Sequence, residues 1–191
     1  MHYFDDLIQH FRATVPLSDA DVPKVVAQFR SYQVKKKNFL LQAGDVSRHM
    51  RFIASGCLRA YYLDEDLQEH TLQFGIEGWW INDLYSYLTQ TPARHFIQAI
   101  ENSVVLQIHQ DALNQLFDEV PMIERFFRLK IQRGYVHLQE RMTNQMSQDS
   151  KQRYLDFRAK YGDIEQRVPQ YMIASYLGIT PEFLSTLRKA K

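Results

Sequence analysis

The side chains that most clearly indicate a function lie in residues 170–187, near the C-terminal end of the sequence. Ala174 stands in the middle of one helical stretch, and Gly178 follows four positions later. A helix-turn-helix needs a small residue where its helices cross and a residue that tolerates positive φ in the turn. Thr180 and Pro181 then suit the N-cap and the first turn of a second helix. The pattern predicts two helices that cross closely through a glycine turn.

The second helix of this pair is amphipathic. We expect its inner side to carry Ile179, either Phe183 or Leu184, and Leu187. Its other positions are polar, and their side chains are of types that bond to base edges in a major groove. The basic tail, residues 188–191, suits contacts to phosphates, which position a protein without selecting sequence. The candidate DNA-binding residues are Gln170, Thr180, Glu182, Ser185, Thr186, Arg188 and Lys189.

The distribution of charge agrees with a polyanionic partner. The 191 residues hold 23 Lys and Arg against 22 Asp and Glu, but the last 42 residues hold eight against four. A basic surplus at one end of a balanced chain is typical of nucleic-acid binding, although a solvated surface gives the same count. The hydrophobic content of 45% and aromatic content of 13% exclude intrinsic disorder.

The compartment is indicated by features that the sequence lacks. Cys57 is the single cysteine, which excludes an internal disulfide and a four-cysteine iron–sulfur or zinc site. No apolar run reaches the roughly 18 residues of a membrane span. Residues 1–6 are acidic where a signal peptide is basic. We therefore expect a cytoplasmic protein.

The elements that must position the C-terminal pair change in type along the chain. Apolar spacing predicts packing helices over residues 4–11 and 22–29. Residues 34–108 show short alternating stretches separated by glycine and acidic turns, which favours an antiparallel sandwich or barrel. A short helix is expected over residues 112–117.

A long helix follows this strand-rich region. Pro121 suits a first helical position, and only Gly134 interrupts the helical pattern over residues 122–147. One narrow apolar seam runs along it and requires a partner helix, so we expect a dimer contact rather than a core helix. The seam consists of Ile131, Tyr135, Leu138 and Met142.

The region between the long helix and the C-terminal pair is less regular. We expect a helix over residues 151–161 that ends at Gly162 and Asp163. Residues 164–168 suit a strand or turn, and a helix over residues 169–177 follows.

Together these stretches resemble the Crp/Fnr family of transcription regulators, over essentially the whole chain. The resemblance is carried by residues 41–45, 53–56, 77–84, 167–170 and 173–182. It implies an α+β protein with a double-stranded β-helix jelly roll in residues 1–118, a dimerisation helix in 119–148 and a winged helix-turn-helix in 149–191. It also implies a homodimeric, sequence-specific DNA-binding regulator, with RNA polymerase as a candidate partner. Because almost no sequence is left after the second helix to form a wing, we expect any wing to lie in residues 162–168.

The sequence departs from the family at the cyclic-nucleotide cassette. In the family this cassette has Gly-Glu-Leu followed by an Arg-Ser or Arg-Thr pair. There, Glu binds the ribose hydroxyl and Arg neutralises the cyclic phosphate. We therefore expect no cyclic nucleotide and leave the effector, if there is one, an unidentified small molecule. The corresponding candidate effector-pocket residues are Asn82, Asp83, Leu84, Arg94 and His95.

Two alternatives remain open. One is a small-molecule-binding or enzymatic jelly roll whose C-terminal helix pair is only structural, and the other is a degenerate family member that binds proteins. A bound metal or a cluster of ionisable residues inside the barrel would favour the first alternative. A monomeric state in solution, or a recognition helix covered by other chain, would favour the second. No catalytic motif is present, and His70, His95 and His109 lack metal-ligand spacing, so we expect neither an enzyme nor a metal site.

Overall fold

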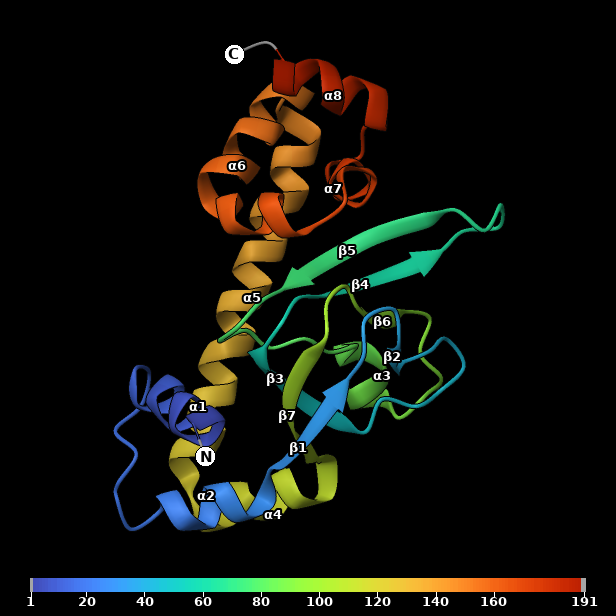
Figure 1. The fold of residues 1–191 in the computed structure, drawn as a ribbon. Coiled ribbons are helices and arrows are strands. Elements are labelled where there is room, and N and C mark those ends of the chain that lie inside the picture. The colour runs from blue at the N-terminus through green and yellow to red at the C-terminus, as the bar shows by residue number, and fades with distance from the viewer. Residues whose placement is uncertain (1, 190–191) are drawn as a thin grey trace.

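The computed structural model describes residues 2–189 and consists of a strand-rich body, one long helix and a C-terminal group of helices (Figure 1). The helices are α1 (His2–Arg12), α2 (Val22–Gln28), α3 (Leu84–Thr89), α4 (Gln110–Glu119), α5 (Pro121–Ser147), α6 (Ser150–Arg167), α7 (Gln170–Leu177) and α8 (Pro181–Lys189). The strands are β1 (Arg30–Val34), β2 (Phe39–Leu41), β3 (His49–Ser55), β4 (Leu58–Leu63), β5 (Glu69–Gly75), β6 (Phe96–Ala99) and β7 (Ser103–His109).

The strands form two antiparallel sheets, which together with α3 we call the β-roll. One sheet has the order β1-β7-β3 and the other β2-β6-β4-β5. Apolar side chains from both sheets meet between them, including Ile53 and Val105 from the first and Leu58 and Ile97 from the second. The expected antiparallel jelly-roll architecture is therefore present.

A second apolar core joins the outer face of the three-stranded sheet to the flanking helices. Phe52 of β3 and Phe11 of α1 are buried in this core. The first turns of α5 contribute Ile123, Phe126 and Phe127, all buried. The long helix is thus fixed to the β-roll at its N-terminal end.

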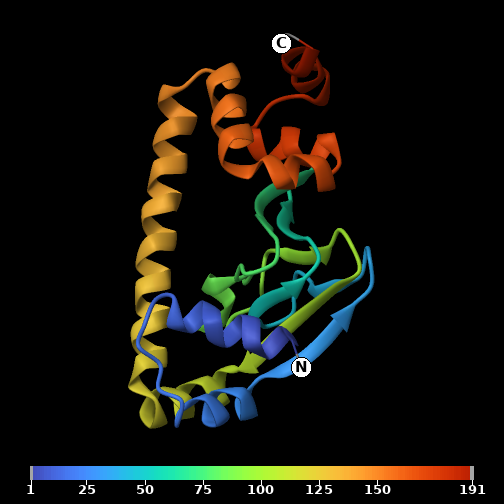
Figure 2. The ribbon, with the colours of Figure 1, turned by 60° about the vertical axis from the view of Figure 1, so that its left-hand side comes forward.

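The remainder of α5 extends past the β-roll and leads to the C-terminal helices (Figure 2). Helices α6, α7 and α8 enclose a third apolar core that contains Phe157, Ile173 and Leu184. Phe74 and Cys57 of the β-roll belong to the same core. The C-terminal helices therefore pack directly on the β-roll of their own chain.

The prediction of a wing in residues 162–168 is wrong. Helix α6 kinks at Tyr161 (φ −133°, ψ 35°), and residues 162–167 then form a further helical segment that ends at Arg167. The first helical segment of α6 is thus interrupted beside Gly162, where its end was predicted, and the segment that follows buries Ile164 in the same core as Tyr154. Within residues 2–189 the last strand is β7, so the described part of the C-terminal segment contributes no β-hairpin wing.

Candidate nucleic-acid interface

The glycine turn between α7 and α8 has the predicted geometry. Gly178 adopts the left-handed conformation (φ 67°) and its N–H donates to the carbonyls of Ala174 and Ser175. The N–H of Ile179 also donates to the Ala174 carbonyl, at 3.0 Å. Ala174 is completely buried, as a close helix crossing requires. The prediction of two helices crossing at a glycine turn is confirmed.

Helix α8 has one buried side and one exposed side. The Thr180 hydroxyl accepts a hydrogen bond from the Phe183 N–H at 3.2 Å, so Thr180 is the N-cap. Leu184 is 1% exposed whereas Phe183 is 44% exposed, which identifies Leu184 as the inner residue. Ile179 and Leu187 are partly buried against the same core.

The polar face of α8 lies at the surface of the chain. Thr180, Glu182, Thr186 and Lys189 are exposed, as is Gln170 at the start of α7, while Ser185 and Arg188 are half-buried. This arrangement favours a binding surface over a purely structural helix pair, because the chain does not cover the polar side. The end of the predicted basic tail, Ala190 and Lys191, lies outside the described residues.

Arg188 has a partner within the chain. Its Nε lies 3.6 Å from Oε1 of Glu165 on α6. The same carboxylate accepts a hydrogen bond from the Tyr154 hydroxyl at 2.7 Å and lies 3.6 Å from Arg158. Burial and the bond to Glu165 raise the pKa of Tyr154. Of the two predicted basic residues, Lys189 is therefore the more accessible to a phosphate.

The apolar seam of α5 is exposed in the single chain. Tyr135, Leu138 and Met142 have exposed fractions of 61%, 54% and 53%, and Ile131 of 42%. Met146, 84% exposed, prolongs the row by one more turn. The predicted seam did not include Met146, although its four-residue spacing from Met142 places it on the same side of the helix. Such a stripe is costly to leave in water and suits a second helix.

The predicted effector-pocket residues lie in different environments. Asp83 is 4% exposed, and its carboxylate accepts the Ser86 N–H at 3.0 Å as the N-cap of α3. Its other oxygen lies 3.4 Å from Nδ1 of His95. Arg94, by contrast, is exposed. The structure brings Asp83 and His95 together and uses Asp83 to begin a helix.

The other two predicted pocket residues also serve the fold. The Asn82 side-chain oxygen accepts the backbone N–H of Arg51 at 3.0 Å. Leu84 packs against the core formed by the flanking helices. An additional charged group, Arg51 itself, is 4% exposed in the β-roll and donates to the carbonyls of His49 and Leu40. Burial lowers the pKa of Arg51 to about 10.

The structure offers no obvious metal or thiol chemistry. Among residues 2–189 no three His, Cys, Asp or Glu side chains are grouped so as to hold a metal ion. Cys57 is completely buried, and burial raises the pKa of its thiol to about 12, which keeps it protonated at neutral pH. No helix in the described part of the chain is long and apolar enough to cross a membrane.

Three polar residues that contact the β-roll were not predicted. Arg141, Arg167 and Ser175 bond to groups that are between 66 and 106 positions away in sequence. No local spacing marks such contacts, so only the folded chain identifies them.

Comparisons with known proteins agree with this geometry. The family model described as the cyclic nucleotide-binding domain matches residues 32–120. The regulatory protein HlyX of Actinobacillus pleuropneumoniae is 26% identical over 172 residues, which cover 83% of this chain and 70% of HlyX. The fumarate and nitrate reduction regulatory protein of Vibrio cholerae is 30% identical over 98 residues, or 50% of this chain and 38% of that protein.

Solved structures of regulators share the whole fold. The c-di-GMP-responsive global regulator CLP of Xanthomonas campestris superimposes with a TM-score of 0.73 at 13% identity, covering 90% of both chains. The catabolite activator protein of Thermus thermophilus gives a TM-score of 0.60 at 16% identity, covering 92% of this chain and 84% of that one. The sequence relatives, which are regulatory proteins, and the fold shared with solved Crp/Fnr structures together indicate a regulator of the Crp/Fnr type.

Proposed function

We propose that this regulator is a homodimer that binds a specific, two-fold symmetric DNA site through α8. The observation that carries the proposal is the division of α8 into a buried side, led by Leu184, and an exposed polar side. Exposed Glu182 is suited to accept a hydrogen bond from a cytosine amino group, and Thr186 lies one turn further along the same side. Lys189 at the end of α8 suits a phosphate.

The dimer in this proposal is formed by the α5 seam. Two copies of the helix packed along Ile131, Tyr135, Leu138 and Met142 would remove four exposed apolar side chains from water. A two-fold axis along this contact would place two α8 helices for successive major grooves, about 34–36 Å apart.

The proposal is tested by selecting bound sequences from a random pool of duplex DNA with the wild-type chain. We expect a palindromic consensus with half-site centres about 10 base pairs apart. A consensus with a single half-site would contradict the dimeric form of the proposal. Recovery of random sequence would contradict specific DNA binding altogether.

The dimer is tested separately by Leu138→Glu, which places a charge in the seam. We expect a monomer by sedimentation velocity and a loss of affinity for the palindrome of roughly a hundredfold or more, because the two half-sites are then bound independently. Thr143→Glu is the matched control, since Thr143 is exposed on α5 but lies outside the seam. A Leu138→Glu protein that remained dimeric would contradict the assignment of the interface.

A further inference from the structure

The C-terminal helices are attached to the β-roll of the same chain by polar contacts at three places. The first is the Arg167 guanidinium at the end of α6. It donates to Glu77 at 2.7 and 3.0 Å and to Glu101 at 2.7 and 3.1 Å. Both carboxylates belong to turns of the β-roll, Glu77 after β5 and Glu101 between β6 and β7. One arginine thus bonds to two separate turns with paired, directional contacts.

The Glu77 carboxylate is also held from the β-roll side. Its Oε1 accepts the N–H of Gly56 at 2.7 Å. Gly56 has a φ of 99°, and a Cβ there would lie 2.1 Å from the Ser103 hydroxyl, so this turn fits closely against the start of β7. The hydrogen bonds from Arg167 are the largest cause of the lowering of the pKa of Glu77 to about 2. Glu77 is therefore ionised and oriented at neutral pH.

The second contact joins α7 to the exposed edge of a sheet. Strand β5 lies at the edge of the order β2-β6-β4-β5. The Ser175 hydroxyl accepts the N–H of Thr71 at 2.9 Å and donates to the carbonyl of Glu69 at 2.8 Å. One side chain of α7 thereby pairs with two backbone groups of an edge strand, as a neighbouring strand would.

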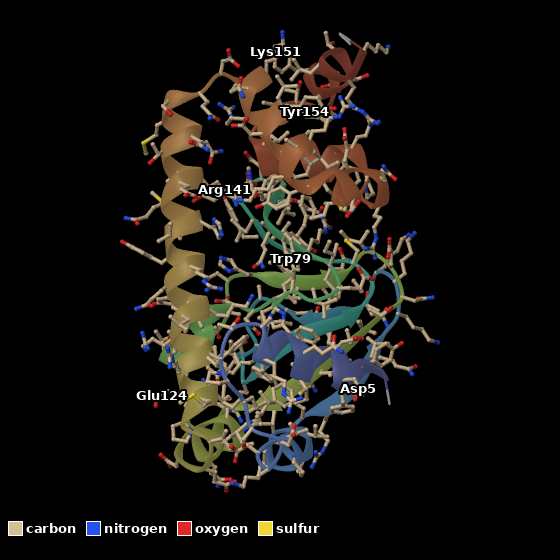
Figure 3. All side chains as sticks on the ribbon, turned by 90° about the vertical axis from the view of Figure 1, so that its left-hand side faces the viewer. Asp5, Trp79, Glu124, Arg141, Lys151 and Tyr154 are labelled. Carbon is tan, nitrogen blue, oxygen red and sulfur yellow. The ribbon has the colours of Figure 1, made fainter. Side chains whose placement is uncertain are left out.

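The third contact joins α5, β5 and α7 through Arg141. Its guanidinium donates to the carbonyl of Leu72 and, at 3.0 Å, to the carbonyl of Tyr176. It also lies 4.0 Å from the centre of the Tyr176 ring. Figure 3 shows Arg141 extending from α5 toward the C-terminal helices. At the register shift between β4 and β5, Leu72 has no paired residue on β4, and its carbonyl accepts the hydrogen bond from Arg141.

These contacts surround the apolar core that the β-roll shares with the C-terminal helices. Phe74 of β5 lies 5.4 Å from Tyr176 and 6.5 Å from Phe157, measured between ring centres. The Trp79 ring lies 5.8 Å from that of Tyr161. A rotation of α7 on the β-roll would break these aromatic contacts and the polar contacts around them. Because α8 follows α7 through a three-residue turn, its position is fixed as well.

We propose that Arg141, Arg167 and Ser175 are positioning residues that set which half-site spacing the dimer accepts. The inference rests on the proposed DNA-binding function and assigns these residues no contact with DNA. In a dimer the distance between the two α8 helices depends on the α5 contact and on how each helix pair sits on its own β-roll. Rigid docking allows one distance, whereas loose docking allows several at the cost of affinity for the best one.

The test measures binding to palindromes with the selected spacing and with one base pair added or removed. For the wild-type chain we expect the altered sites to bind roughly tenfold or more weakly, because one base pair rotates a half-site by about 34–36°. Arg167→Met should reduce this preference to within about threefold, mainly through weaker binding at the best spacing. Arg167→Lys keeps the charge and some donors, so it should retain part of the preference.

Two controls make the test specific. Lys151→Met removes one charge from an exposed position of α6 that does not contact the β-roll. This variant should keep the wild-type preference for one half-site spacing. The double variant Glu77→Met, Glu101→Met should behave as Arg167→Met does, since it removes the acceptors of the contact. The packing of the C-terminal helices on the β-roll can be monitored without DNA by measuring the rate of hydrogen exchange at the Thr71 N–H. We expect this rate to increase in Arg167→Met.

The outcomes separate this inference from the proposed function. If the wild-type chain selects no DNA, the proposed function fails, and faster Thr71 exchange in Arg167→Met still supports the docking contact. If the wild-type chain and Arg167→Met bind DNA with the same spacing preference, the positioning role is overturned and the DNA-binding function stands.

Discussion

The α3 end of the β-roll and the exposed side of α8 use similar polar residues in opposite ways. At α3, Asp83 is buried and bonds to Ser86 and His95. On α8, Glu182 is exposed and carries its carboxylate at the surface. A polar group whose hydrogen bonds are made within the chain stabilises the fold, whereas an exposed one remains available to a partner.

The comparison teaches that residue type alone does not locate a binding site. Asp83 occupies the place where the family resemblance predicts a ligand-binding acid, and its proximity to a helix start gives it a structural partner instead. The polar side chains of α8 face away from a core that Leu184 and Ala174 fill. The orientation of the helix decides which of its side chains remain exposed.

Among changes to α8, replacement of Glu182 should have the largest effect on DNA binding. For Glu182→Gln we expect base preference to change at one position of each half-site, with a loss of about 1–3 kcal/mol on the wild-type consensus. The reason is that an amide presents a donor where the carboxylate offers only acceptors. Fluorescence anisotropy on single-base variants of the consensus provides the measurement. Glu140→Gln, an exposed position on α5, is the matched control and should bind as the wild-type chain does.

Asp83→Ala tests the other side of the comparison. We expect the free energy of unfolding to fall by about 1–2 kcal/mol, because the N-cap of α3 and the contact with His95 are both lost. Asp83→Asn keeps an acceptor for the Ser86 N–H and should lose much less. Urea denaturation gives the values. An Asp83→Ala protein as stable as the wild-type chain would show that Asp83 is not used structurally and would reopen the pocket as a ligand site.

The sequence allowed most of the architecture to be predicted, since local patterns mark its elements. Gly178 and Thr180 specify the turn and the cap, and the strict spacing from Ile131 to Met142 marks the seam of α5. The exposed side of α8 followed from the same amphipathic pattern. These predictions rested on residues within one or two helical turns of each other.

The failures have a common physical cause in contacts between distant residues. Residues 164–168 were expected to form a strand or turn, but a second helical segment follows the kink at Tyr161, places Ile164 in the third core and leaves no wing there. The proximity of Arg188 to Glu165 was also not predicted, and the assignment of Arg188 to phosphates stays a prediction. The docking contacts of Arg141 and Arg167 were not predicted for the same reason.

The partner of Arg188 provides a finer test within α8. Lys189→Ala should weaken binding to all sequences by a few fold and lower the slope of log affinity against log salt by about one. Arg188→Ala should lower the slope less, because Glu165 already neutralises part of that charge. Anisotropy titrations over a range of salt concentrations distinguish the two. Equal slopes for both variants would show that Arg188 leaves Glu165 when DNA binds.

The smallest expected effect concerns His10 of α1, whose ring nitrogen Nε2 is buried without a partner in the described chain, against the second core. The His10 ring lies 5.2 Å from Phe52 and 5.5 Å from Phe126, and within the described chain its Nε2 has no hydrogen-bond partner. Burial, aided by Lys130, lowers the pKa of His10 to about 4 from an ordinary 6.5. Between pH 6.5 and 4, His10 binds a proton in the unfolded chain but not in the folded chain. The free energy of unfolding therefore falls as the pH falls.

Replacing His10 by Phe removes this titration while keeping a ring in the aromatic cluster. We therefore expect the Phe variant to lose less stability than the wild-type chain between pH 6.5 and 4, measured by urea denaturation at several pH values. Part of the loss should remain, because burial lowers the pKa of His49 to about 4 as well. His137→Gln, at an exposed position, should not change the pH profile. A His10→Phe profile parallel to that of the wild-type chain would mean that the folded protein can protonate His10, and hence that water reaches the ring.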